Sequence, residues 1–222
     1  MEDNTFNNLK EQIEEWIRFD YIQPADIPAI ELYMDQITTF MDKQLRGNKR
    51  HEDDKILTKT MINNYSKNNL LPPSNKKKYS KDHIILLIYI FYLKNFLSIN
   101  DIQQLLKPMT DTYFHAESGI TMSDIYNDLF QLEQEYGIKV RESIQDVYKI
   151  ADGKFNQSDD YLKTFAMITM LSYDIYAKKQ LVEKLIDSLH PEPVTKAELK
   201  EAKELAKQKE KAEKQKRKEL QE

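Results

Sequence analysis

The chain has 222 residues, of which 40% are hydrophobic and 32% charged, and its formal net charge is −4. This length suits one large domain or two small ones. It contains no cysteine, which excludes disulfides, thiolate metal ligands and cysteine nucleophiles and suits a reducing compartment. Its start is acidic and polar, unlike a signal peptide, and its longest apolar run, Ile84 to Leu93, is too short to cross a bilayer. We therefore expect a cytoplasmic protein without membrane contact.

Apolar residues recur at three- and four-residue spacing along most of the chain, and only four glycines interrupt it, so we expect a mostly helical protein. Thr58, Ser80, Ser98 and Thr121 are placed to cap helices at their N-termini, and Pro108 is expected to end one. The segment after Ser80 is apolar on every side, which predicts a buried central helix. The expected helices cover residues 6–19, 30–45, 59–68, 81–97, 99–106, 122–136, 140–151 and 159–189.

The charge is unevenly distributed. Between Lys55 and Lys81 there are seven lysines and no aspartate or glutamate, so the rest of the chain is strongly acidic. A local basic segment on an acidic protein indicates a binding site for a polyanion.

On a helix that starts after Thr58, the apolar side chains Leu57, Met61, Ile62 and Tyr65 fall on one side. The opposite side carries polar residues at helical spacing. Asparagine can bind the N6 and N7 edge of adenine in the major groove, and lysine can bind phosphate or guanine. This helix has the chemistry of a DNA recognition helix, and its candidate contact residues are Thr58, Lys59, Thr60, Asn63, Asn64 and Lys67.

Asn69 tolerates the left-handed conformation that ends many helices, and Pro72 and Pro73 forbid the helix from continuing. A short turn then carries Lys76, Lys77 and Lys78, followed by Tyr79. Lysines on a hairpin beside a recognition helix would bind the phosphate backbone, which supplies affinity but no sequence information. The arrangement predicts a winged helix-turn-helix.

The stretch TKTMINNYSKNNLLPP, followed by KKKYSKDHIILLIYIFYLKNFLSINDIQQLL, resembles the DNA-binding head of MerR-type regulators. Their pattern is a Ser- or Thr-capped recognition helix, an aromatic residue, Gly-Leu-Leu-x-Pro, a basic wing ending in Tyr-Ser, and a helix closing on Phe-Ser-[Leu/Ile]-x-x-Ile. The whole chain is similar to a bacterial family of unknown function with this head, in which ELYMDQ, TKTMINNY and a helical C-terminal half recur. By position, Asn69 stands for the usual glycine and Lys77 for the wing arginine.

The resemblance implies a mostly α fold with a MerR-like winged helix-turn-helix and a small β-wing, followed by an all-helical C-terminal region. We expect four segments: an N-terminal helix in 1–26, the MerR-like domain in 27–107, a helical region for dimerisation in 108–190, and a charged Lys/Glu-rich tail in 191–222. The implied function is a sequence-specific, double-stranded DNA-binding transcriptional repressor that acts as a homodimer. The tail could be a solvated helix, frayed coil or a weak coiled coil.

The sequence shows no phosphate loop, nucleophile elbow or HExxH motif, so we expect no enzymatic activity, no catalytic residues and no cofactor. The four histidines are scattered, and no metal site is expected. Aromatic residues of the C-terminal half leave a small-molecule effector open without a residue-level assignment. A second hypothesis is a helical adaptor that uses the same head to bind a protein instead of DNA.

Overall fold

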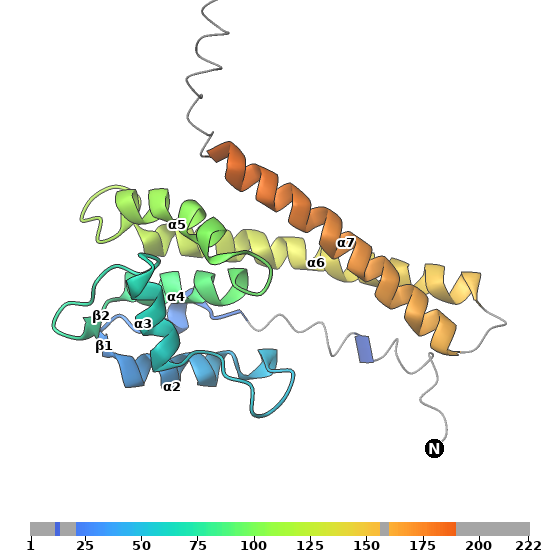
Figure 1. Ribbon diagram of the computed structural model, residues 1–222, viewed down its shortest axis with the longest axis horizontal. Coiled ribbons are helices and arrows are strands. Elements are labelled where there is room, and N and C mark those ends of the chain that lie inside the picture. The colour runs from blue at the N-terminus through green and yellow to red at the C-terminus, as the bar shows by residue number, and fades with distance from the viewer. Residues whose placement is uncertain (1–11, 14–20, 156–159, 190–222) are drawn as a thin grey trace, which may run out of the picture. The chain divides into compact units, whose positions relative to one another are not determined.

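The computed structural model describes residues 12–13, 21–155 and 160–189. The chain divides into two compact units, Met1–Ile186 and Asp187–Glu222, and the fold below is that of the first unit. The helix expected over 6–19 and the charged tail lie largely or wholly outside the described residues. Helices make up most of the described chain, which confirms a mostly α fold (Figure 1).

The two longest connections between described elements that lack regular structure are residues 49–58, between η2 and α3, and residues 68–77, between α3 and β2. In chain order they are η1 (Pro24–Asp26), β1 (Leu32–Tyr33), α2 (Met34–Gln44), η2 (Arg46–Asn48), α3 (Lys59–Lys67), β2 (Lys78–Tyr79), α4 (Lys81–Leu93), α5 (Ile99–Tyr113), α6 (Met122–Lys154) and α7 (Asp160–Leu189).

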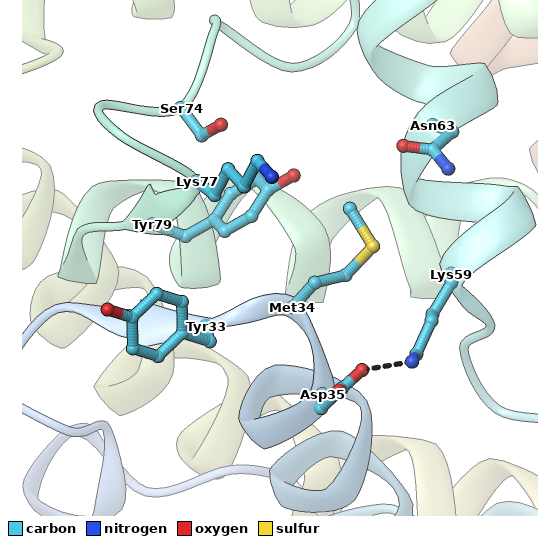
Figure 2. Close-up of a pocket in the computed structure, with 8 residues that line it drawn as sticks. All are labelled: Tyr33, Met34, Asp35, Lys59, Asn63, Ser74, Lys77 and Tyr79. Atoms are coloured by element: carbon cyan, nitrogen blue, oxygen red, sulfur yellow. Dashed lines mark ion pairs between the residues drawn. The ribbon is translucent and has the colours of Figure 1, made fainter.

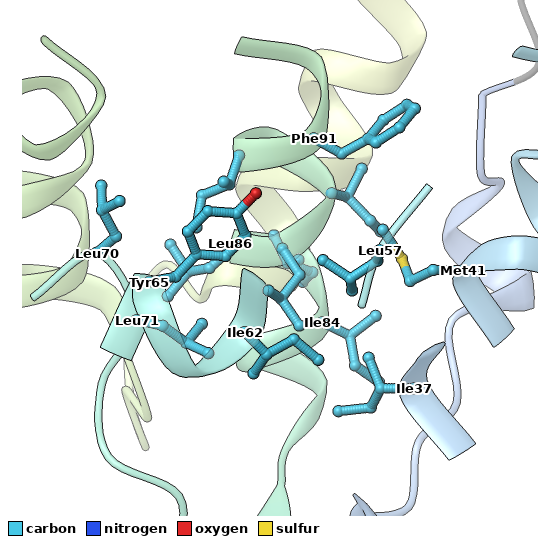
Figure 3. Packing of buried hydrophobic residues seen from close by; sticks show 14 of the residues in the cluster. Ile37, Met41, Leu57, Ile62, Tyr65, Leu70, Leu71, Ile84, Leu86 and Phe91 are labelled. Carbon is cyan, nitrogen blue, oxygen red and sulfur yellow. The ribbon is translucent and has the colours of Figure 1, made fainter. Parts of the chain in front are cut away.

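Helix α4 is the centre of the main hydrophobic core, as its apolar composition predicts. Eight of its residues are buried, and Figure 3 shows Ile84, Leu86 and Phe91 of α4 among side chains from α2 and α3. Each buried Leu, Ile or Phe stabilises the fold by about 1.5–3 kcal/mol relative to an exposed one. This core fixes α2 and α3 against a common support.

The only sheet among the described residues pairs β1 with β2 in antiparallel register, Leu32 with Tyr79 and Tyr33 with Lys78. The helix expected over 30–45 is therefore wrong at its start, since α2 begins at Met34. The partner strand holds residues 32 and 33 in an extended conformation. The backbone N–H of Tyr33 then donates to Gln36 Oε1 at 2.8 Å and caps the helix that follows.

Three predicted helix ends are also wrong. The helix expected over 81–97 stops earlier, since α4 ends at Leu93. Helix α5 continues through Pro108, although an interior proline costs about 3 kcal/mol. Met109 and Tyr113, which follow it, pack against the main core, and their burial offsets this cost. Helix α6 runs without a break through Gly137, because one glycine inside a helix costs only about 1 kcal/mol, which packing along a long helix readily exceeds.

The chain reverses direction after α6, and α7 crosses α6 obliquely (Figure 1). Met167 of α7 shares a small core with Tyr148 and Ala151 of α6 and with Ile13. Lys163 Nζ lies 2.8 Å from the Asp152 carboxylate. Near the other end of α7, Val182 and Ile186 pack against the main core, so α7 is anchored at both ends.

Candidate nucleic-acid interface

Helix α3 has the two faces that its sequence predicts. Ile62 and Tyr65 are buried and Met61 is half-buried. The opposite side presents five exposed polar residues, Lys59, Thr60, Asn63, Asn64 and Lys67. No acidic residue lies on the helix. The exposed side of α3 therefore carries basic and uncharged polar side chains, and its apolar side packs into the core.

Both ends of α3 are fixed by local hydrogen bonds. Thr58 Oγ1 accepts from the Met61 backbone N–H at 3.2 Å, as expected of an N-cap. At the other end, the Asn68 side-chain amide donates to the Asn64 carbonyl at 2.8 Å. Asn69 has a φ of 54°, which confirms the left-handed ending expected there. The orientation of the exposed face is therefore set by sequence within and beside the helix.

The side-chain amides of Asn63 and Asn64 make no hydrogen bond to another described residue. Each amide has two donors and one acceptor oxygen. In an exposed position these groups are satisfied by water, which a ligand can replace without breaking an intramolecular bond. The two residues can therefore present a paired donor and acceptor to a partner.

The lysine run forms a tight hairpin. Asn75 and Lys78 exchange both backbone hydrogen bonds, with N···O distances of 3.1 and 2.8 Å, and Lys76 and Lys77 occupy the turn with φ values of 49° and 65°. Two central residues with positive φ are typical of a type I′ turn, which normally uses Asn-Gly. Two lysines in this conformation cost about 1–2 kcal/mol each. The turn places both charges at an exposed tip.

Lys78 and Tyr79 differ from the two lysines at the tip. Lys78 is half-buried and its Nζ lies 5.6 Å from the centre of the Tyr33 ring, within the range of a cation–π contact. Tyr79 is only 5% exposed and belongs to the main core. Tyr79 was expected to contact DNA, but its side chain is buried and packs in the core below the hairpin.

His83 lies under this hairpin. Its ring packs edge-on against Tyr79 and Phe114, with centroid separations of 5.3 and 4.9 Å. His83 Nδ1 accepts the Ser80 backbone N–H at 3.0 Å, so Nδ1 is unprotonated. Nε2 is buried and has no hydrogen-bond partner among the described residues. Burial lowers the pKa of His83, because the charged imidazolium is poorly solvated there.

An open cavity of about 450 Å³ lies between α3 and the hairpin (Figure 2). Lys59 and Asn63 of α3 and Lys77 of the turn line it from facing sides. The structure thus brings residues from both predicted contact segments to one cavity. Its lining residues are Tyr33, Met34, Asp35, Lys59, Asn63, Ser74, Lys77 and Tyr79.

Asp35 is a lining residue that the sequence did not predict. It lies in the first turn of α2, and its carboxylate forms an ion pair with Lys59 Nζ (Figure 2). The side chains of Lys59 and Asp35 are 61% and 70% exposed, so water competes with the pair and makes it weak. Tyr33 is a second lining residue that the sequence did not predict. Residues 30–45 were expected to be helical, and the pairing of Tyr33 with Lys78 in the sheet has no local sequence pattern.

No group of three or more His, Asp or Glu side chains in the part of the chain that the structure describes could hold a metal ion. None of the described helices is long and apolar enough to cross a membrane.

The geometry defines a helical domain in which α3 and a basic hairpin share one cavity. Residues 22–129 match the model of a family described as a domain of unknown function, DUF1836. The matched region contains α2, α3, the hairpin, α4 and α5, and it ends within α6. No curated protein and no solved structure matches the chain.

Proposed function

We propose that the chain is a sequence-specific, double-stranded DNA-binding regulator of transcription. In this proposal α3 lies in the major groove, and β1, β2 and the lysine turn are the wing of a MerR-like winged helix-turn-helix. The observation that carries the proposal is the cavity shared by Lys59, Asn63 and Lys77. It supports a single ligand that touches the helix and the hairpin at once.

The exposed face of α3 suits base recognition. B-DNA's major groove is about 12 Å wide and admits an α-helix. The Asn63 and Asn64 amides, which have no partner among the described residues, can each donate to and accept from an adenine edge. Lys59 and Lys67 would contact phosphates or guanine, and Thr60 would add a hydroxyl contact.

The hairpin suits phosphate binding. Lys76 and Lys77 are exposed at its tip, and the half-buried Lys78 is positioned against Tyr33. Each phosphate that a lysine neutralises adds about 0.9 to the slope of log K against log salt concentration. These contacts would supply affinity and register, and α3 would supply the sequence preference.

We propose that the protein acts as a homodimer. One recognition helix and one wing contact few base pairs, and regulators of this architecture gain specificity by binding two half-sites about 34–36 Å apart, or a multiple of that. Occupation of a promoter by such a dimer would exclude RNA polymerase, which makes repression the mode that we propose. Its place of action would be the bacterial cytoplasm.

Selection of binding sites from random duplex DNA, at a stated salt concentration, tests the proposal. We expect enrichment of an inverted repeat. Asn63→Ala and Asn64→Ala should each weaken the preference at particular bases by roughly 1–3 kcal/mol, with little effect on binding to unrelated DNA. Failure of the wild-type chain to enrich any sequence would contradict the proposal.

One observation favours a second candidate function, a head that binds a protein partner. Asp35 lies beside the lysines of the cavity and pairs with Lys59. A protein partner can present complementary charges of both signs to such a surface, whereas the DNA backbone presents negative charge alone. An adaptor would enrich no sequence from random DNA, and its binding to duplex DNA would not exceed that of a variant with Lys76, Lys77 and Lys78 changed to alanine.

A further inference from the structure

A groove separate from the proposed DNA interface lies between the end of α3 and α5. It consists of two adjoining cavities of about 290 and 320 Å³, which share Asn69 and Thr110 in their linings. Neither cavity shares a lining residue with the cavity beside Lys59. Ser66 lies in the last turn of α3 and Asn69 just beyond it, at the opposite end of the helix from Lys59. We call the two adjoining cavities the α3–α5 groove.

The local sequence shapes both walls of the groove. The α5 wall is one face of the helix, because its residues are spaced by three and four positions. They are Gln103, Leu106, Lys107, Thr110 and Asp111. The opposite wall is the turn after α3, which the positive φ of Asn69 allows. Leu70 and Leu106 are buried side chains that face the groove, so its base is apolar.

Several polar groups of the lining have unused hydrogen-bonding capacity. The side chains of Ser66, Asn69 and Gln103 make no hydrogen bond to another described residue. Thr110 Oγ1 donates to the Leu106 carbonyl at 2.9 Å, which leaves its lone pairs free to accept. A ligand can replace water on these groups without breaking an intramolecular bond.

Lys107 and Asp111 are the only charged residues among the described lining residues. Lys107 Nζ lies 2.7 Å from Asp111 Oδ2, and the two side chains are 64% and 60% exposed. Water competes with such a pair, so it is weak and opens readily. One cation and one anion together give the groove no attraction for a polyanion, and a ligand with a single charge would leave one of the two without a complementary group.

We propose that the α3–α5 groove binds a free α-amino acid with an apolar side chain. Its carboxylate pairs with Lys107 and its ammonium group with Asp111. Both groups of an α-amino acid are attached to one carbon, so they lie about as close together as the Lys107 and Asp111 charges do. The apolar side chain packs on Leu70 and Leu106.

The size of the groove fits this ligand. Ligand sites are commonly about 300–1,000 Å³, and each of the two cavities is near the lower end of that range. The free amides of Asn69 and Gln103 complete the hydrogen bonds of the ligand's charged groups. The inference is independent of the proposed function, since it uses no residue assigned to DNA.

Isothermal titration calorimetry of the full chain with L-leucine, L-isoleucine, L-valine, L-methionine and L-phenylalanine at up to millimolar concentration tests this inference. We expect at least one of them to bind at one site per chain. Its amide, which lacks the carboxylate, and its N-acetyl derivative, which lacks the ammonium group, should each bind at least about tenfold more weakly. Absence of binding by all five amino acids would overturn the inference, as would equal binding by the two blocked derivatives.

Lys107→Met and Asp111→Asn locate the site. Each keeps nearly the shape of the side chain and removes its charge, so the amino acid should bind about tenfold more weakly or worse. Lys178→Met and Asp174→Asn are the matched controls, because Lys178 and Asp174 form a pair of the same spacing on α7, at 2.6 Å and with side chains 57% and 48% exposed. The controls should bind as the wild type does.

Helix content and thermal unfolding show that each variant is folded. Full affinity in both groove variants would overturn the assignment of the ligand to this groove, as would an equal loss of affinity in the α7 controls. The two proposals fail separately. A chain that binds an amino acid but selects no DNA sequence removes the proposed function and leaves the groove, and a chain that selects DNA without binding an amino acid does the reverse.

Discussion

The ammonium group of Lys59 in α3 forms an ion pair with the carboxylate of Asp35 in α2, and both residues line the cavity between α3 and the hairpin. Lys59 is the first residue of the proposed recognition helix. A phosphate that approaches Lys59 must therefore compete with a carboxylate that is already beside it. Because both side chains are largely exposed, the competition is weak and the lysine remains available.

Replacement of Asp35 by asparagine should strengthen DNA binding. The change frees Lys59 and removes a negative charge that repels phosphate. We expect a higher affinity at all sequences and a slope of log K against log salt concentration that is steeper by up to about 0.9. Fluorescence anisotropy with a labelled duplex over a salt series measures both quantities.

Asp146→Asn is the matched control for this change. Asp146 is also exposed and pairs with a lysine, Lys149, at 2.9 Å, but it lies on α6 outside the cavity. A control that raises affinity as much as Asp35→Asn would show that net charge alone matters.

The positive φ values of Lys76 and Lys77 should make the turn of the hairpin less stable than a turn with residues that favour this conformation. Replacement of Lys76 by Asn and Lys77 by Gly supplies the preferred residues of a type I′ turn, so the free energy of unfolding should rise by about 1–2 kcal/mol. The double alanine variant loses the same two charges without relief of the positive φ. We expect both variants to lose DNA affinity equally and to differ in thermal stability. Equal stabilities would contradict the strain in this turn.

Loss of the Thr58 cap should affect stability and DNA binding together. Thr58→Ala removes the bond to the Met61 N–H and should cost about 1 kcal/mol, with fraying at the start of α3 and weaker specific binding. Ser98→Ala removes an equivalent cap on α5 and should cost similar stability without weakening DNA binding. Thr58→Ser should restore both properties. Chemical denaturation and anisotropy give the two measurements.

His83 should make stability depend on pH. Burial lowers its pKa in the folded state, so the unfolded chain binds the proton more readily. The free energy of unfolding then falls as pH drops below the unfolded value of about 6.5, by at most about 1.4 kcal/mol per pH unit, until the folded pKa is passed.

His83→Gln tests this dependence directly. Glutamine at this position keeps the capping box with Ser80 but cannot titrate. Its stability between pH 7 and pH 5 should change less than that of the wild type. An identical pH dependence in the two proteins would exclude His83 as its source.

Features set by neighbouring residues could be predicted from the sequence. The Thr58 cap, the positive φ of Asn69 and the buried face of α3 each depend on a few adjacent side chains. The central position of α4 followed from its apolar composition. For the same reason, the α3 residues expected to contact DNA are exposed, as predicted. They are Lys59, Thr60, Asn63, Asn64 and Lys67.

Features set by distant contacts could not be predicted. Strand β1 exists because Leu32 pairs with Tyr79, and α5 passes Pro108 because Met109 and Tyr113 pack on the core. The Lys59–Asp35 ion pair joins two helices, and no local pattern indicates it. The buried position of Tyr79 was likewise hidden, since a tyrosine beside lysines is equally typical of a surface.

The salt dependence of binding to the selected operator tests the central claim most directly. The comparison is between the wild type, the Lys76→Ala/Lys77→Ala/Lys78→Ala variant, and a variant with the exposed α6 lysines 139, 149 and 154 changed to alanine. Both variants lose three positive charges. We expect the hairpin variant to lower the slope of log K against log salt concentration by about 2–3, and the α6 variant to leave it nearly unchanged. Equal slopes for all three proteins would contradict the assignment of this surface to DNA.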